Sequence, residues 1–233
     1  EAANRGECHQ SWRGGYRVVS DDGEHECERG RHVVLSGKDI CAMPFLERLL
    51  DAGVDARKIE GRNRNATYVH TVISAYRQAI DAWRGGTLTK ELKTELTERL
   101  RTVYNRGFSS GHFLGQPVNA FTNTRGSSAT RRKDNVGVVA NYYARPGVAE
   151  ILVQDREFQV GDELVIEGPT TGVLRVTVAE IRQHERQVTR AQRGLATVKV
   201  GAKVRPNDKV ARLRAAEFNS DGPGADGQIV EPS

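Results

Sequence analysis

The stretch Arg57-Lys58-Ile59-Glu60-Gly61-Arg62, followed by the amphipathic run from Asn65 to Trp83, determines how the first half of this chain is interpreted. A short apolar segment, a cluster of charges and one glycine come directly before a long helical pattern. The stretch therefore predicts a strand over 54–60 that ends in functional groups. In a β/α barrel, catalytic and binding groups lie at the carboxyl ends of the strands, and the following helix covers the outside. The alternative interpretation is a strand end whose charges are simply solvated.

Apolar residues recur at helical spacing three times in the first half of the chain. They predict a helix over about 40–52 that buries Ile40 and can be capped by Ser36 or Asp39, a helix over 66–83, and a helix that begins at Thr87 or Thr89. Short strand signals lie at 16–19, 32–35 and 54–60. Strands that alternate with helices are typical of a parallel α/β unit. So few strands cannot close a barrel, so these residues are expected to be the last part of one.

The second half of the chain has an all-β pattern. Six short strands separated by Gly, Pro or Asp are expected at 136–139, 149–153, 163–166, 173–178, 196–200 and 210–213. The turn from Phe158 to Leu164 resembles the Gly-Asp turn of elongation-factor-type β-barrels. The predicted fold class is therefore α/β plus all-β, a C-terminal fragment of a β/α (TIM-like) barrel followed by a small elongation-factor-like β-barrel.

This fold predicts four segments along the chain. They are the barrel strands and helices over 1–115, a linker over 116–134, the β-barrel over 135–217 and a disordered tail over 218–233. Within the linker, the basic run Arg131-Arg132-Lys133 is expected to be a solvated turn, with contact to RNA as the alternative.

Composition limits the kind of partner and the compartment. The chain has 233 residues and a formal net charge of +5, which permits an anionic partner such as RNA. It contains no run of 18 apolar residues that would predict a membrane span, and no signal peptide. An odd number of cysteines, three, argues against a disulfide framework and favours a cytoplasmic setting. Because the chain begins at Glu1 without a Met, we expect it to be a piece of something longer.

Several short motifs occur in one order over the first 115 residues. They are Asn4-Arg5-Gly6-Glu7-Cys8-x-Gln10, Leu35-Ser36-x-Lys38-Asp39-Ile40-Cys41, Lys58-Ile59-Glu60-Gly61-Arg62, Tyr76-Arg77-x-Ala79-Ile80 and Asn105-Arg106-Gly107-Phe108-Ser109-x-Gly111. Together they resemble the U-32 family of collagenase-like peptidases. The β-rich second half is similar to the C-terminal β-barrel domain that many members carry.

The resemblance implies a β/α barrel whose first strands are supplied by an upstream segment or a partner subunit. Many members resemble factors for oxygen-independent hydroxylation of a tRNA uridine, a 23S rRNA cytidine or a ubiquinone precursor, with prephenate as a donor in the RNA cases. Several hold a 4Fe–4S cluster on four cysteines. The motifs place two of these ligands at Cys8 and Cys41, while the other two precede the region present here. Two thiolates alone cannot complete such a cluster.

The remaining candidate residues permit more than one role. The resemblance makes Lys58, Glu60, Arg62 and Tyr68 substrate-binding residues, because guanidinium groups suit a dicarboxylate such as prephenate. The alternative for the charged ones is a structural ion pair that closes the top of the barrel. A second alternative is zinc shared between chains, on Cys8 or Cys41 with His9. Cys27 matches no motif and is expected to be a thiol in a turn.

Three functions are therefore possible for the intact protein. The first is RNA hydroxylation with an iron–sulfur cluster, for which this fragment alone would be inactive. The second is a collagenase-type hydrolase, although Ser109-Ser110-Gly111-His112 places a hydroxyl near an imidazole only in sequence, which does not make a catalytic triad. The third is a non-catalytic module that binds RNA or a partner protein.

Overall fold

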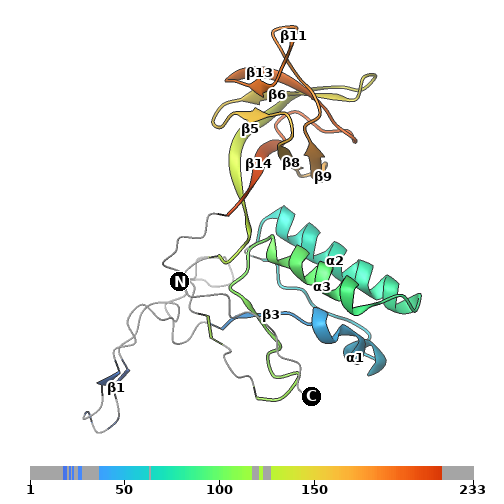
Figure 1. The fold of residues 1–233 in the computed structure, drawn as a ribbon, viewed down its shortest axis with the longest axis vertical. Helices are drawn as coiled ribbons and strands as arrows, with labels where there is room; N and C mark the ends of the chain where they lie inside the picture. The colour runs from blue at the N-terminus through green and yellow to red at the C-terminus, as the bar shows by residue number, and fades with distance from the viewer. Residues whose placement is uncertain are drawn as a thin grey trace. The chain divides into compact units, whose positions relative to one another are not determined.

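The computed structural model describes residues 18–19, 21, 23, 26–27, 37–62, 64–116, 121–122 and 127–216. The chain divides into two compact units, one formed by 1–130 with 217–233 and the other by 131–216 (Figure 1). Each unit is considered by itself below. The strand expected at 32–35, Cys8, His9 and the expected tail lie outside the described residues.

Two short parallel strands organise the first unit. Strand β3 (Asp39–Ile40) pairs with β4 (Phe108–Ser109) in parallel, and the helices lie between them in the sequence. This connection through helices is the one that parallel strands require, as the alternation of strands and helices predicted. A separate antiparallel pair, β1 (Val18–Val19) with β2 (Glu26–Cys27), includes the end of the strand expected at 16–19.

The helix expected over 40–52 begins later than predicted. Asp39 and Cys41 donate backbone N–H groups to the carbonyls of Gly107 and Ser109, both at 3.0 Å, and these ladder bonds hold the residues extended. Ile40 is accordingly exposed by 63% and not buried, and Asp39 caps no helix. Helical structure starts with the 3₁₀ turn η3 (Met43–Phe45) and continues as α1 (Leu46–Asp51).

The prediction of a strand over 54–60 is wrong. These residues form an irregular segment without ladder hydrogen bonds to any other described residue, and Val54 and Ile59 are exposed. Gly53 does end α1 in the left-handed conformation expected of a terminating glycine, with φ of +75°. A strand needs a neighbour to accept its hydrogen bonds, and the apolar pattern alone does not supply one.

Two antiparallel helices cover the parallel strand pair. Helix α2 (Ala66–Arg84) is capped by the side chain of Asn65, and α3 (Lys90–Arg101) by that of Thr89. On α3, Leu96 and Leu100 are buried, whereas α2 buries a face of small residues and leaves Ile73 exposed. That face consists of Thr67, Thr71, Val72, Ala75 and Ala79. None of the described helices is long and apolar enough to cross a membrane.

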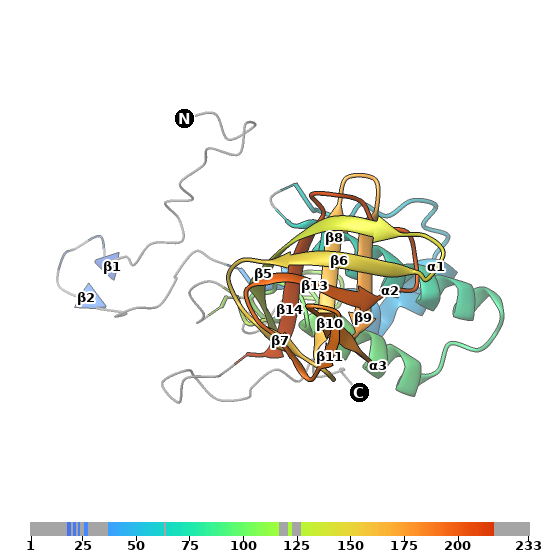
Figure 2. The same ribbon diagram turned by 90° about the horizontal axis from the view of Figure 1, so that it is seen from above.

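The second unit is an eight-stranded antiparallel sheet with the order β11-β10-β13-β6-β5-β14-β8-β9. Its strands curve around a common interior, which Figure 2 shows from above. Their bounds are β5 Arg131–Tyr143, β6 Val148–Val153, β8 Glu163–Gly168, β9 Gly172–Thr177, β10 Ile181–Gln183, β11 Arg186–Val188, β13 Gly194–Lys199 and β14 Lys209–Ala215. All six predicted strands are confirmed. A separate short pair joins β7 (Phe158–Gln159) to β12 (Arg190–Ala191).

The basic run Arg131-Arg132-Lys133 is part of this sheet, so the expected solvated turn is wrong. Arg131 forms an ion pair with Glu163, and Lys133 forms one with Glu167 at 2.7 Å. Glu163 and Glu167 lie on β8 with Val165, which is fully buried but is not part of the main core. The β unit therefore begins at residue 131, four residues before the predicted boundary. Its first strand extends this far because the long side chains of Arg131 and Lys133 reach acidic side chains of β8.

A close backbone approach in this sheet can be tested with glycine variants. A Cβ at Gly137 would overlap the carbonyl oxygen of Leu152 on the neighbouring strand, whereas a Cβ at Gly201 would meet open space. We therefore expect Gly137→Ala to lower the free energy of unfolding by about 2 kcal/mol or more and Gly201→Ala to leave it nearly unchanged. Urea denaturation followed by circular dichroism measures both. Equal stabilities of the two variants would contradict the strand register.

Candidate functional site

A partly buried ionic contact lies at the amino ends of the two parallel strands. The carboxylate of Asp39 accepts hydrogen bonds from the backbone N–H of Arg106 at 2.9 Å and from its guanidinium at 2.6 Å. The guanidinium of Arg64 lies 3.9 Å from the same carboxylate. One carboxylate thus joins β3, the segment before α2 and the residue that leads into β4. This carboxylate faces two guanidinium groups, and its hydrogen bond to Arg106 is of the strong, charge-assisted kind.

Arg64 also lies over two aromatic rings. Its guanidinium carbon is 3.8 Å from the centre of the Tyr104 ring and 5.4 Å from that of Tyr68. Burial raises the pKa of Tyr68, and the nearby Arg64 opposes this only in part. The Tyr68 hydroxyl therefore stays protonated at neutral pH. A protonated phenol can donate a hydrogen bond to an anionic ligand, which a phenolate cannot do.

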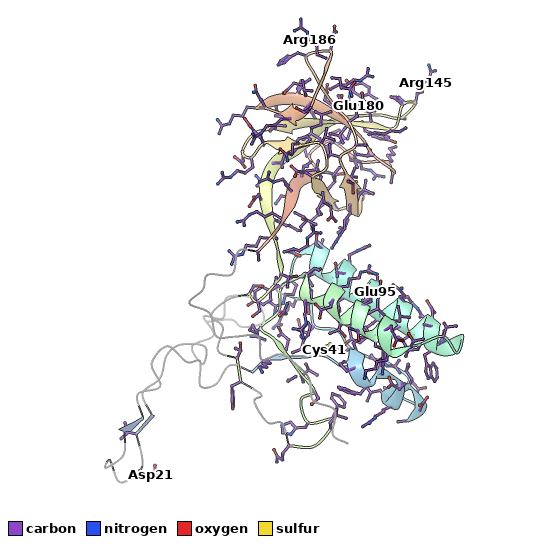
Figure 3. All side chains as sticks on the ribbon, viewed as in Figure 1. Asp21, Cys41, Glu95, Arg145, Glu180 and Arg186 are labelled. Carbon is purple, nitrogen blue, oxygen red and sulfur yellow. The ribbon has the colours of Figure 1, made fainter. Side chains whose placement is uncertain are left out.

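Cys41 follows β3 directly and is 2% exposed (Figure 3). Its sulfur accepts a hydrogen bond from the hydroxyl of Tyr76 on α2 at 3.8 Å, and that hydroxyl accepts one from the backbone N–H of Ala42 at 3.0 Å. Burial raises the pKa of the Cys41 thiol, while the backbone of Met43, the Tyr76 hydroxyl and the charge of Arg101 lower it by less. Cys41 is therefore a protonated, inaccessible thiol and a poor nucleophile.

The predicted substrate-binding residues lie along the segment that precedes α2. Lys58, Glu60 and Arg62 are exposed, and the Glu60 carboxylate accepts the backbone N–H of Arg62 at 2.7 Å. Gly61 packs closely on α2, since a Cβ there would lie 3.1 Å from Val69. The structure thus brings Tyr68 to the Asp39 contact through Arg64. Among the described residues, it shows no ion pair between Glu60 and either Lys58 or Arg62.

Other candidate chemistry is limited to single groups. The hydroxyl of Ser109 accepts the backbone N–H of Gly111, and no hydrogen bond within the described part of the chain joins it to the exposed His112. The described residues contain no group of three or more His, Cys, Asp or Glu side chains that could hold a metal ion. Cys27 lies in β2 and not in the expected turn.

The sequence analysis missed the ionic contact because its members are far apart in the chain. Asp39 and Arg106 are 67 positions apart, and no spacing rule connects them. The motif Asn105-Arg106-Gly107 was the one local feature in the sequence analysis that could have indicated this contact. The buried side chain of Asn105 donates to the carbonyls of Arg101 and Val103 and accepts the N–H of Gly107, which has φ of +80°. This motif therefore builds the turn that aims Arg106 at Asp39.

Comparison with known proteins gives the family. The model of peptidase family U32 matches residues 1–123. The chain belongs to peptidase family U32. A protein named collagenase from Porphyromonas gingivalis strain W83 is 42% identical over 93% of this chain and 52% of its own length. The U32 chain thus spans about half the length of the curated relatives it matches.

Other U32 relatives carry different names. An uncharacterized protease of Methanocaldococcus jannaschii is 31% identical over 91% of this chain and 53% of its own length. The tRNA hydroxylation protein P1 of Bacillus subtilis is 31% identical over 72% of this chain and 40% of its own length. The solved C-terminal domain of a Geobacillus thermoleovorans protein assigned to the U32 peptidases covers 34% of this chain and 91% of that domain, with 20% identity and a TM-score of 0.32.

The Asp39 contact predicts a stability difference between two carboxylates. Asp39→Asn removes the charge that two guanidinium groups surround, so we expect the free energy of unfolding to fall by about 1–3 kcal/mol. Asp81→Asn removes an exposed partner of Arg77 on α2 and is the matched control, for which we expect no change in the unfolding midpoint. Urea denaturation followed by the fluorescence of Trp83 compares them. Equal midpoints for Asp39→Asn and the wild type would contradict the structural role of the contact.

Proposed function

We propose that this chain is the C-terminal part of a U32 protein whose intact form hydroxylates RNA without oxygen. The supporting observation is the buried, hydrogen-bonded Cys41 directly after a parallel strand, beside the Asp39–Arg106 contact. Relatives named tRNA hydroxylation proteins in Bacillus subtilis and Escherichia coli, and a 23S rRNA 5-hydroxycytidine synthase of Escherichia coli, support the choice of RNA. Enzymes that act on bases need both a redox or hydrolytic centre and an RNA-binding surface.

The proposal includes a β/α barrel that upstream residues complete. Ile40 is 63% exposed although it lies in a parallel strand, while the next residue, Cys41, packs with the helical core. Phe113, which follows β4, is exposed as well. Parallel strands are normally covered on both faces and paired at both edges. Further strands of the longer protein would cover Ile40 and Phe113 and place the end of β3 at the mouth of a barrel.

The surroundings of Cys41 fit one thiolate ligand of a 4Fe–4S cluster. Cluster potentials depend on hydrogen bonds to sulfur and on burial, and here the Tyr76 hydroxyl points at the sulfur in a site closed to solvent. Arg101 adds a positive charge that favours the deprotonated ligand. Cys8 would supply a second thiolate and the upstream segment two more. The bound cluster would supply one-electron transfer. Zinc on Cys8, Cys41 and His9 is the alternative centre.

The segment before α2 would bind the anionic co-substrate. Lys58 and Arg62 are exposed cations, and the Tyr68 hydroxyl stays protonated. Two cations and a phenol donor suit a dicarboxylate such as prephenate. Arg64 would position the Tyr68 ring and not contact the ligand, because its guanidinium is already held between Asp39 and the two tyrosines.

A collagenase-type hydrolase is the second candidate, because relatives with that name share 42% identity with this chain. Such an enzyme needs an activated nucleophile beside a base. The described residues offer a protonated thiol at Cys41 and a serine at 109 without a hydrogen bond to His112. The geometry of this part of the chain therefore favours the first candidate.

Iron analysis tests the cluster directly. The protein carrying its natural upstream sequence is purified without oxygen, and iron, sulfide and the absorbance spectrum are measured for the wild type, Cys41→Ser and Cys27→Ser. We expect iron and sulfide in the wild type and in Cys27→Ser, and a loss of most of both in Cys41→Ser, because one of four thiolates is removed. An iron-free wild type, or full iron in Cys41→Ser, would contradict the proposed role.

Product analysis separates the two candidate functions. RNA from cells that lack and cells that carry the longer protein is digested, and hydroxylated nucleosides are quantified by mass spectrometry. We expect the hydroxylated nucleoside to disappear without the protein and to stay absent with Cys41→Ser. The same preparation is incubated with gelatin. Gelatin cleavage that is abolished by Cys8→Ala, with RNA unchanged, would favour the hydrolase instead.

A further inference from the structure

The net positive charge of this protein comes entirely from the β unit. Residues 131–216 contain 16 Lys and Arg against 10 Asp and Glu, a net charge of +6, whereas the remaining residues contain 19 against 20. A protein domain with such an excess attracts polyanions over distances of about one Debye length. The total of +5 for the chain therefore understates the charge that a ligand of the β unit would meet.

Some of the cations of the β unit form ion pairs, whereas others are exposed and unpaired among the described residues. Six acidic residues of the unit bind cations on β5, β14, β9, β10 and β12. The cations in these pairs are Arg131, Lys133, Arg175, Arg182, Arg190, Arg212 and Arg214. By contrast, Arg145, Lys199 and Lys203 are exposed and form no ion pair with another described residue.

These three cations belong to one end of the sheet. Arg145 lies in the turn between β5 and β6, where Figure 3 shows it projecting from the unit. Lys199 ends β13 and is paired in register with Val148, the first residue of β6. The segment that carries Lys203 starts beside the same turn, because Val200 donates its N–H to the carbonyl of Gly147 at 2.8 Å.

An exposed aromatic ring lies in the row of register partners that contains Lys199 and Val148. Tyr143 of β5 is 43% exposed and pairs with Val148, so Tyr143, Val148 and Lys199 point to one face across three neighbouring strands. Strands lie about 4.8 Å apart, which places the backbones of Tyr143 and Lys199 roughly 10 Å apart. Glu150 lies beside them, and the Tyr143 hydroxyl donates a hydrogen bond to its carboxylate at 3.4 Å.

We propose that Tyr143, Arg145, Lys199 and Lys203 form a binding site for single-stranded RNA on the β unit. The cations would contact phosphates, and an unpaired base would stack on the Tyr143 ring, the combination by which proteins bind single strands without reading a sequence. A base within a duplex cannot stack on this ring, because its faces are already covered. The choice of RNA as the polyanion rests on the function proposed above.

Binding of the full 233-residue chain to an oligonucleotide tests the site. The probe is a fluorescein-labelled oligouridylate of about 12 nucleotides, and its anisotropy gives Kd at several KCl concentrations between about 50 and 200 mM. The site variant is Arg145→Gln with Lys199→Gln and Lys203→Gln. The matched control is Arg132→Gln with Arg156→Gln and Arg186→Gln, which removes the same charge from exposed cations elsewhere on the unit.

We expect the site variant to weaken binding at least tenfold and to reduce the slope of log K against log salt by about 2, since three phosphate contacts are lost. The control variant should change Kd less than threefold. Tyr143→Ala should weaken binding about fivefold or more without changing the slope, and Tyr143→Phe should restore it, because stacking needs the ring and not the hydroxyl. A duplex of the same length should bind more weakly than the single strand.

Several other results would contradict the proposed RNA-binding site. Equal weakening by the two triple variants would show diffuse attraction, and equal affinity for duplex and single strand, or full binding by Tyr143→Ala, would exclude stacking. An absence of binding would also refute it. Failure here is distinguishable from failure of the proposed function, because Cys41→Ser should lose iron in the longer protein, whereas the same substitution in the 233-residue chain should leave oligonucleotide binding unchanged. Iron with no RNA binding refutes the site alone, whereas RNA binding without iron refutes the cluster alone.

Discussion

The first unit depends on the contact between Asp39 and Arg106. Two strands of two residues each cannot hold together by their ladder alone, since they share so few hydrogen bonds. The carboxylate of Asp39 adds a bond to the backbone of Arg106 and one to its side chain, directly where β4 begins. Helices α2 and α3 can then pack over a fixed pair of strands. Because the same contact fixes the backbone before Cys41, the position of the thiol depends on it as well.

The sequence predicted what local chemistry determines. The helix start at Thr89 and the left-handed glycine at Gly53 follow from neighbouring residues, and both are confirmed. The six longer strands of the β unit were also found, because short apolar runs separated by Gly, Pro or Asp predict them. The strand at 54–60 and the helix start at Ile40 were wrong for one reason. Whether an apolar segment becomes a strand depends on a partner that lies elsewhere in the chain.

The candidate site shows the same division. Cys41 and Tyr68 could be named from motifs, but nothing local shows that Tyr76 bonds to the sulfur or that Arg64 lies between Asp39 and Tyr68. Those contacts form only when α2 packs on the strand pair. A thiol desolvated in this way is a weak nucleophile in water-free surroundings, yet it remains a good ligand for a soft metal centre that can displace its proton. The surroundings of Cys41 therefore favour the ligand role proposed above over a nucleophilic role.

The β unit contains charged side chains of two kinds, those held in ion pairs along its strands and those exposed at one end of the sheet. Along β5, β14 and β8, acidic side chains pair with basic ones on strands that also carry the buried Val165 and Leu213, so the charges there are matched within the fold. At the end formed by the β5–β6 turn and β13, cations stand exposed beside a tyrosine and contribute little to packing. Unpaired like charges repel one another, which opposes folding slightly. A cluster of this kind costs stability unless an anion neutralises it, and this is why an anionic ligand explains its position better than solubility does.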